Sequence, residues 1–164
     1  MKYGIDVPPF GPLGNARTLA TLARDAEQAG WDGFFIWDHV ARAWTLDIVD
    51  PWVALAAMAV NTGHIRLGTL VTPLPRRRPW KVARETVSLD HLSGGRLILG
   101  VGLGSGRDEE WGHFHEETDL KRRGQMVDMR SQNGTTYLKY LVPTRGLLGF
   151  RSQFMRATSG MGQI

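Results

Sequence analysis

Four short apolar segments alternate with three helix-like segments along the first hundred residues, and this alternation limits the possible folds more than any other feature of the sequence. The expected strands are residues 3–7, 33–36, 65–71 and 96–101. The expected helices follow Asn15 and cover 52–61 and 80–92. Strands and helices that alternate at near-regular spacing predict an α/β fold with a parallel sheet.

The helix boundaries carry clear local signals. Asn15 can cap a helix whose apolar residues recur at helical spacing, and Gly30 follows its end. Asp50-Pro51 combines an N-cap with a proline at the first helical position. We expect Thr72-Pro73 to end the third strand, because proline cannot donate a backbone hydrogen bond to a neighbouring strand.

Asp38-His39 directly follows the second expected strand. In a parallel α/β sheet the carboxyl ends of the strands carry the chemistry, so both residues are candidate catalytic residues. A simpler interpretation fits the position equally well: Asp38 caps a turn and His39 is a surface residue.

The fourth strand leads into a glycine run at 100–106. A dinucleotide-binding fingerprint requires G-x-G-x-x-G, and in the two possible registers Ser105 or Arg107 stands where the third glycine should be. We therefore interpret the run as a strand end that lets a flat cofactor approach the backbone.

Two further motifs favour structural interpretations. His113 and His115 are two residues apart on an expected helix over 108–123, so they point in different directions, and we assign no metal site. We expect Arg76, Arg77 and Arg78 to be exposed in a proline-bounded loop. The sequence has no P-loop motif and no cysteine, which excludes that mode of GTP binding, disulfides and thiolate metal sites.

The charge of the chain is unevenly distributed. Residues 1–120 have a net charge of −3, whereas 121–164 hold eight basic residues against one acid and have a net charge of +7. A basic tail indicates a nucleic-acid partner, although solvated basic loops give the same count. The longest apolar run, 53–60, is too short for a membrane span, and the N-terminus does not resemble a signal peptide, so we expect a cytoplasmic protein without membrane contact.

The alternation of parallel strands and helices ends after Gly106. Strands over 125–129 and 136–142 flank Asn133-Gly134, a strong turn signal, and predict an antiparallel hairpin. The glycine-punctuated stretch 146–155 is expected to form a helix.

The segments 29–39, 65–73 and 95–104 together resemble the luciferase-like monooxygenase family, over about residues 1–128. The resemblance implies a TIM-barrel fold and FMN or the deazaflavin F420 as cofactor. The ring would lie over Asp38, His39 and the cofactor-binding residues Thr69, Leu70, Gly102, Leu103, Gly104 and Ser105.

The resemblance also implies a non-proline cis peptide in the third strand, which we expect at Thr69–Leu70. Two positions depart from the family's F420-dependent sugar-phosphate dehydrogenases: Ser105 stands in place of their catalytic glutamate, and Trp44 lies one position away from their active-site tryptophan. Such barrels have eight βα units, whereas four are visible here.

Residues 121–164 resemble the C-terminal region of the TypA/BipA translational GTPases, through Arg122–Met129 and above all through the string Val142–Arg151. The resemblance implies a ferredoxin-like α+β fragment that lies near ribosomal RNA. The two resemblances overlap at Lys121–Asp128, where we infer a junction. Recombination, misassembly and deliberate fusion would each produce such a chain.

The sequence thus predicts four parallel βα units of a truncated TIM barrel at 1–120, followed by a small α+β fragment at 121–164. The predicted function is that of an FMN- or F420-dependent oxidoreductase or monooxygenase acting on a small molecule, with activity reduced or lost by truncation. The alternative is a non-enzymatic RNA-associated fragment, which would make weak contacts through 121–164. We also expect self-association, because half of a barrel leaves strand edges and one sheet face open.

Overall fold

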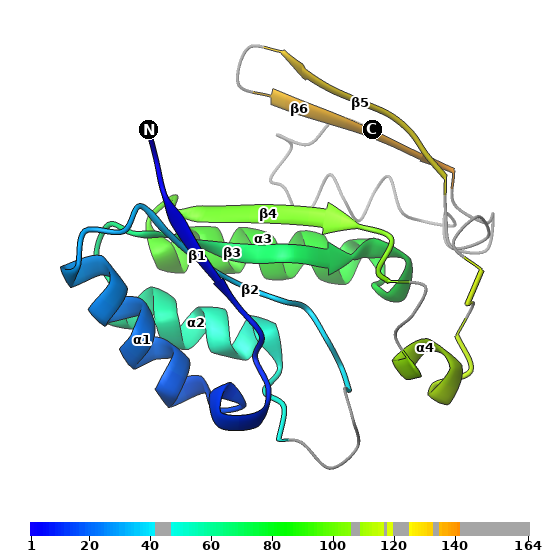
Figure 1. The fold of residues 1–164 in the computed structure, drawn as a ribbon. Helices are drawn as coiled ribbons and strands as arrows, with labels where there is room; N and C mark the ends of the chain where they lie inside the picture. The colour runs from blue at the N-terminus through cyan, green and yellow to red at the C-terminus, as the bar shows by residue number, and fades with distance from the viewer. Residues whose placement is uncertain (42–46, 106–108, 117, 120–124, 133–134, 142–164) are drawn as a thin grey trace.

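Four parallel strands form the central sheet, as the alternation predicts. The computed structural model describes residues 1–41, 47–105, 109–116, 118–119, 125–132 and 135–141. The strands are β1 (Gly4–Val7), β2 (Gly33–Ile36), β3 (Arg66–Pro73) and β4 (Leu97–Gly102), and they pair in the order β1-β2-β3-β4 (Figure 1). All three pairings are parallel, which confirms the predicted fold class.

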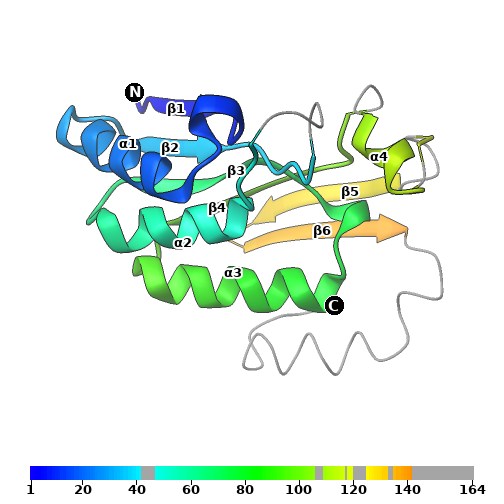
Figure 2. The same ribbon diagram turned by 90° about the horizontal axis from the view of Figure 1, so that it is seen from below.

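Three helices connect the strands and cover one face of the sheet. They are α1 (Ala16–Gln28), α2 (Pro51–Asn61) and α3 (Pro79–Ser93), and both ribbon views show them on the same side (Figures 1 and 2). The predicted helix starts are confirmed: the side chain of Asn15 accepts a hydrogen bond from Arg17 N, and that of Asp50 accepts from Trp52 N and Val53 N.

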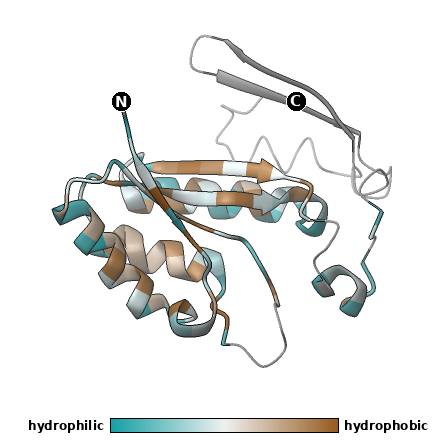
Figure 3. Ribbon diagram, viewed as in Figure 1, coloured by the Kyte–Doolittle hydropathy of each residue, from teal (hydrophilic) through white to brown (hydrophobic). Residues whose placement is uncertain are grey.

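The core lies between the sheet and these helices. Phe34 and Ile36 of β2 point toward the helices and are at most 2% exposed, because alternate residues of a strand face opposite sides. They pack among buried helix residues, and apolar colour is concentrated along the strands and the inner sides of the helices (Figure 3). The buried helix residues include Leu19, Ala23, Leu55 and Met58.

The other face of the sheet carries no helix among the described residues. The ring of Phe35 lies against Gly4 and Gly33, where a Cβ would come within 2.9 Å and 2.6 Å of it. Farther along this face Leu70 and Ile98 are 42% and 41% exposed. The sheet therefore has one buried and one largely open side.

The middle of β3 differs from expectation in two ways. The strand does not end before Thr72 but continues to Pro73, which is paired with Gly102. The cis peptide bond joins Leu70 and Val71 rather than Thr69 and Leu70. The pairing of β3 with β4 is regular through Thr69 and resumes at Thr72 after a shift in register. Leu70 and Val71 lie between these two positions, so the irregular part of the strand falls one residue later than predicted.

Between β4 and residue 119, the described residues contain a shorter helix than expected. Of the helix predicted over 108–123, the described residues 109–116 and 118–119 form α4 (Glu109–His113), which lies past the C-terminal ends of β3 and β4 (Figure 1), and are not helical after His113; the rest of that range lies outside the described residues. Two short 3-10 helices, η1 (Gly11–Leu13) and η2 (Leu74–Arg76), follow β1 and β3.

The predicted C-terminal hairpin is confirmed. Strands β5 (Gln125–Gln132) and β6 (Thr135–Leu141) pair antiparallel in a sheet of their own. The helix predicted at 146–155 and the residue Trp44 lie outside the described residues. Among the described residues, no helix has the length and apolar character needed to cross a membrane.

Candidate functional site

A hollow of about 260 Å³ opens at the carboxyl ends of β2, β3 and β4. The loops that follow parallel strands lie at the same end of the sheet, so the sequence predicts that residues after β2, β3 and β4 come together here. Most of the predicted site residues come together here. The lining consists of Trp37, Asp38, His39, Leu70, Val71, Pro73, Leu103, Gly104 and Ser105.

Two predicted residues do not line the hollow. Thr69 is fully buried; its hydroxyl donates to the carbonyl of Gly100 at 3.2 Å and accepts from the hydroxyl of Thr72 at 2.9 Å. Gly102 lies beside Val71, whose Cγ2 would be 2.8 Å from an added Cβ. Both residues therefore support the packing of β3 and β4 behind the hollow.

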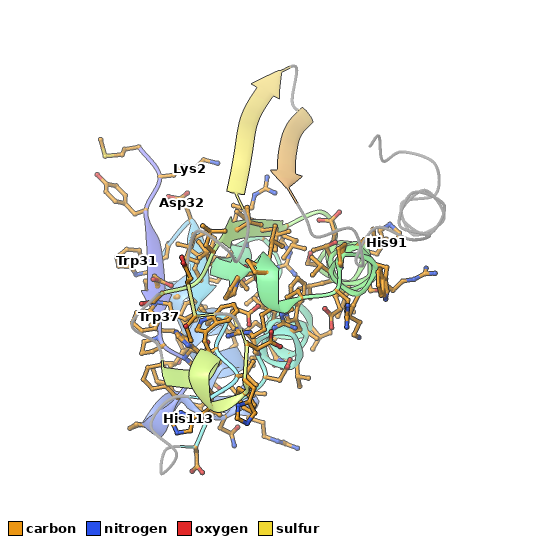
Figure 4. The ribbon with its side chains drawn as sticks, turned by 90° about the vertical axis from the view of Figure 1, so that its right-hand side faces the viewer. Lys2, Trp31, Asp32, Trp37, His91 and His113 are labelled. Atoms are coloured by element: carbon orange, nitrogen blue, oxygen red, sulfur yellow. The ribbon has the colours of Figure 1, made fainter. Side chains whose placement is uncertain are left out.

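An aromatic cluster forms one wall. The ring centroids of Phe10 and Trp37 are 5.9 Å apart, and those of Trp37 and His39 are also 5.9 Å apart. Trp37 Nε1 donates to the carboxylate of Asp6 at 2.8 Å, and the indole lies on the β1 side of the sheet (Figure 4). The sequence interpretation did not include Trp37, although its position directly before Asp38-His39 was the available signal.

Two arginines hold Asp38 in place in the wall of the hollow. Its side chain is 0% exposed, and Oδ1 lies 3.0 Å from Arg76 Nη2 and 2.6 Å from Arg77 Nη2. Arg76 Nη2 also donates to the backbone carbonyl of Asp38 at 2.7 Å. A buried carboxylate needs such partners because burial disfavours its charged form. Asp38 is therefore fixed in position by its ion pairs with Arg76 and Arg77.

Glu110 of α4 completes this ionic cluster. Its Oε2 accepts hydrogen bonds from the backbone N–H groups of Val40 and Ala41 at 3.0 Å and 3.1 Å. Its Oε1 is paired with Arg76 and lies 3.4 Å from His39 Nδ1. Glu110 therefore connects the loop after β2, the turn after β3 and the helix after β4.

The surroundings of Glu110 strongly favour its ionised form. Burial alone would raise its pKa, but the neighbouring His39 side chain, the hydrogen bonds from the backbone of Ala41 and Val40, and the charge of Arg76 together outweigh burial and lower the pKa to about 2. Glu110 is thus a fixed negative charge at neutral pH.

The prediction that all three loop arginines are exposed is wrong for two of them. The side chains of Arg76 and Arg77 are 9% and 15% exposed, and their guanidinium groups also lie over Trp111 and Trp52, respectively. Arg78 is exposed and lies over Trp80. The difference arises because Asp38 and Glu110 supply carboxylates from distant parts of the chain.

The hollow suits a flat, largely apolar group. Leu70, Val71 and Leu103 line it, and Gly104 has a φ of 78°, with Trp111 and Pro73 so close that a Cβ would collide with the indole. No lysine or arginine is among its described lining residues. The hollow can therefore receive a ring, whereas its described walls offer no cation to a phosphate group.

The described residues hold no group of three or more His, Asp or Glu side chains arranged to bind a metal ion. His113 is the last residue of α4, whereas His115 lies beyond it with a φ of 56°. The two histidines therefore do not share a helix.

Two family models match the chain. The model described as luciferase-like monooxygenase matches residues 3–128, and the model described as elongation factor G C-terminus matches residues 117–164. The matches overlap at 117–128, which includes the stretch where the sequence predicts a junction.

Individual relatives and solved structures agree with the first match. A 4-hydroxyprotoasukamycin monooxygenase from Streptomyces nodosus subsp. asukaensis is 38% identical over 110 residues, which cover 64% of this chain and 29% of the relative. The coenzyme F420-dependent tetrahydromethanopterin reductase from Methanopyrus kandleri matches with a TM-score of 0.59 and 28% identity, over 68% of this chain and 30% of that one.

A further structure shares the fold at lower identity. The oxygenating constituent of 3,6-diketocamphane monooxygenase from Pseudomonas putida, solved with FMN, matches with a TM-score of 0.61 and 20% identity, over 84% of this chain and 43% of that one. The chain spans about a third of the length of the curated relatives that it matches.

Proposed function

Because the chain belongs to the luciferase-like monooxygenase family, we propose that residues 1–120 bind the ring of FMN or F420 in the hollow and serve an oxidoreductase or monooxygenase reaction on a small molecule. The observation that supports this proposal is the meeting of three strand ends in one apolar hollow with His39 in its wall. We propose that the chain consists of two units, residues 1–120 and residues 121–164.

The residues of the hollow fit the ring of either cofactor. Leu70, Val71 and Leu103 offer apolar contacts, and Gly104 allows close approach of the backbone. When bound, FMN or F420 would supply hydride transfer, and FMN also oxygen chemistry. The chain itself would orient the substrate and exclude water.

His39 is the residue that we assign to proton transfer, since imidazole can both accept and donate a proton near neutral pH. Asp38 was the other candidate catalytic residue. Its carboxylate is paired with Arg76 and Arg77, so we assign it to holding the loop rather than to contact with substrate.

Ligand titration tests the proposed site. Because the described lining has no cation, FMN and riboflavin should bind with dissociation constants within about threefold of each other and weaker than about 1 μM. Fluorescence quenching of each ligand measures this, and F420 is compared with its core that lacks the phosphate-containing tail. FMN binding that is submicromolar, or at least tenfold tighter than riboflavin binding, would mean that residues outside the described lining hold the phosphate.

A matched pair of variants locates the ring. Leu103→Asp places a charge in the hollow and should weaken riboflavin binding at least tenfold, or about 1.4 kcal/mol. Leu92→Asp changes a 49% exposed leucine of α3 and should leave binding unaltered. Equal binding by Leu103→Asp and the unmodified chain, or no ring binding at all, contradicts the proposed function.

A second candidate function comes from the match of 117–164 to the elongation factor G C-terminus and from the +7 charge of 121–164. We propose that this segment contacts RNA weakly and without sequence preference, since phosphate contacts alone carry no sequence information. The alternative is that its basic residues only keep the segment in solution.

Salt dependence distinguishes these alternatives. If about half of the eight basic residues of 121–164 meet phosphate, the logarithm of the association constant should fall with the logarithm of salt concentration at a slope of roughly −3 to −4. Filter binding of a structured ribosomal RNA fragment at about 50 and 200 mM salt measures the slope.

The double variant Arg145→Gln/Arg151→Gln should make the slope shallower by about one for each lost contact. The control, Arg17→Gln/Arg84→Gln, removes the same charge from exposed positions of α1 and α3 and should leave the slope unchanged. Equal retention of RNA, with equal slopes, by both double variants would exclude Arg145 and Arg151 as phosphate contacts.

A further inference from the structure

Two histidines of this chain face a glutamate at the same distance but in different surroundings. His39 Nδ1 lies 3.4 Å from Glu110 Oε1, and His64 Nδ1 lies 3.4 Å from Glu27 Oε1. The side chains of the first pair are 12% and 2% exposed, whereas the side chain of His64 is 79% exposed. Water can replace the contact at His64, but it has little access to the contact at His39.

The carboxylate that faces His39 has only acceptor atoms to offer. Its Oε2 is occupied by the backbone N–H groups of Val40 and Ala41, and its Oε1 by Arg76. These donors keep Glu110 ionised and fix its orientation. A lone pair on His39 Nδ1 would be repelled by this carboxylate, whereas an N–H would be attracted to it.

Aromatic neighbours hold the ring of His39 in place. Phe10 contacts it edge to face at a centroid distance of 6.2 Å, and Trp37 lies at 5.9 Å. Rotation of the imidazole would break these contacts as well as the approach to Glu110. Nδ1 is buried and has no hydrogen-bond partner among the described residues, and Glu110 Oε1 at 3.4 Å is the carboxylate oxygen that faces it. Nε2 is the other ring nitrogen, and His39 is part of the wall of the hollow.

We propose that Glu110 is a positioning residue that holds the proton of neutral His39 on Nδ1, so that Nε2 carries the lone pair available to a substrate in the hollow. This role rests on the proposed function of the hollow. The proton step would break an O–H or N–H bond of the substrate and form an N–H bond at Nε2, which suits hydroxyl- or amine-bearing molecules. Arg76 neutralises the carboxylate without contacting the substrate hollow.

Nitrogen-15 spectroscopy of the full chain tests the proposal directly. Long-range proton–nitrogen correlations distinguish a protonated ring nitrogen from one that carries a lone pair, and a His39→Asn variant assigns the signals. Spectra recorded from about pH 6 to 10 cover the neutral form of imidazole. We expect neutral His39 to carry its proton on Nδ1, whereas His64 should show the Nε2–H form that free imidazole side chains prefer in water.

The tautomer of His39 in the Glu110→Gln variant is a second test of the proposal. The backbone N–H groups of Val40 and Ala41 need an acceptor, so the amide oxygen should stay with them and the amide NH₂ should face His39. The proton of His39 should then move to Nε2. Glu27→Gln, the matched control, should leave His39 unchanged.

Two outcomes would overturn the proposal: a neutral His39 with its proton mainly on Nε2 in the unmodified chain, or an Nδ1 proton that persists in folded Glu110→Gln. If Glu110→Gln does not fold, the spectrum of the unmodified chain still decides. Because no cofactor is present in these measurements, their failure is separate from a failure of the ring-binding titration.

Discussion

Arg76→Ala is expected to lower the free energy of unfolding by about 3–5 kcal/mol. Arg76 pairs with both Asp38 and Glu110, whose side chains are at most 2% exposed. Removing its guanidinium leaves Arg77 as the remaining partner of Asp38 in the cluster and takes a cation away from Glu110. Urea denaturation at pH 7, followed by circular dichroism, measures the change.

Its neighbour Arg78 provides the control. Arg78 is exposed and lies over Trp80, with a ring distance of 6.0 Å, so Arg78→Ala should cost no more than about 0.5–1 kcal/mol. If Arg76→Ala does not fold, Arg76→Lys retains the charge and should fold with an intermediate loss. Equal stability of Arg76→Ala and Arg78→Ala would show that the buried cluster contributes little.

Light scattering is expected to show that the purified chain self-associates. Among the described strands, β1 and β4 each have a neighbour on one side, and Leu70, Val71 and Ile98 are 39% to 42% exposed on or beside the open face of the sheet. Open strand edges and apolar faces both promote association. The average mass should therefore rise with protein concentration.

Substitutions on the two sides of the molecule test which surface is responsible. Ile98→Lys charges the open face and should shift the chain toward the monomer. Val60→Lys changes a 64% exposed residue of α2, on the helix side, and should leave the mass unchanged. A monodisperse monomer at all concentrations for the unmodified chain would contradict the prediction.

The sheet and its helices could be predicted from sequence because their signals are local. Asn15 and Asp50 cap helices through hydrogen bonds that span two or three residues, and each strand is a short apolar segment between breaks. The strand ends then placed Asp38, His39 and Leu103 at one edge, since parallel strands leave no other arrangement. The hollow forms where the residues that follow these strands meet.

The ionic cluster could not be predicted in this way. Arg76 and Asp38 are 38 positions apart, and Arg76 and Glu110 are 34 positions apart. Three consecutive arginines look alike in sequence, and only the folded chain distinguishes Arg76 and Arg77 from Arg78. Pairing between strands also decides where β3 becomes irregular, so the position of its cis bond was beyond local signals.

The cluster has a consequence for how this chain can change over evolutionary time. Asp38, Arg76, Arg77 and Glu110 lie in the segments that follow three different strands, yet their charges balance as two against two. Replacing one of these residues by an apolar one leaves a buried charge without its partner. A joint replacement such as Arg76→Met with Glu110→Leu removes opposite charges together, so it should lower the free energy of unfolding by less than the sum of the two separate replacements.

The three loops that border the hollow are therefore not free to diversify one at a time. New binding specificities would have to arise at wall positions outside the cluster, such as the uncharged Leu103.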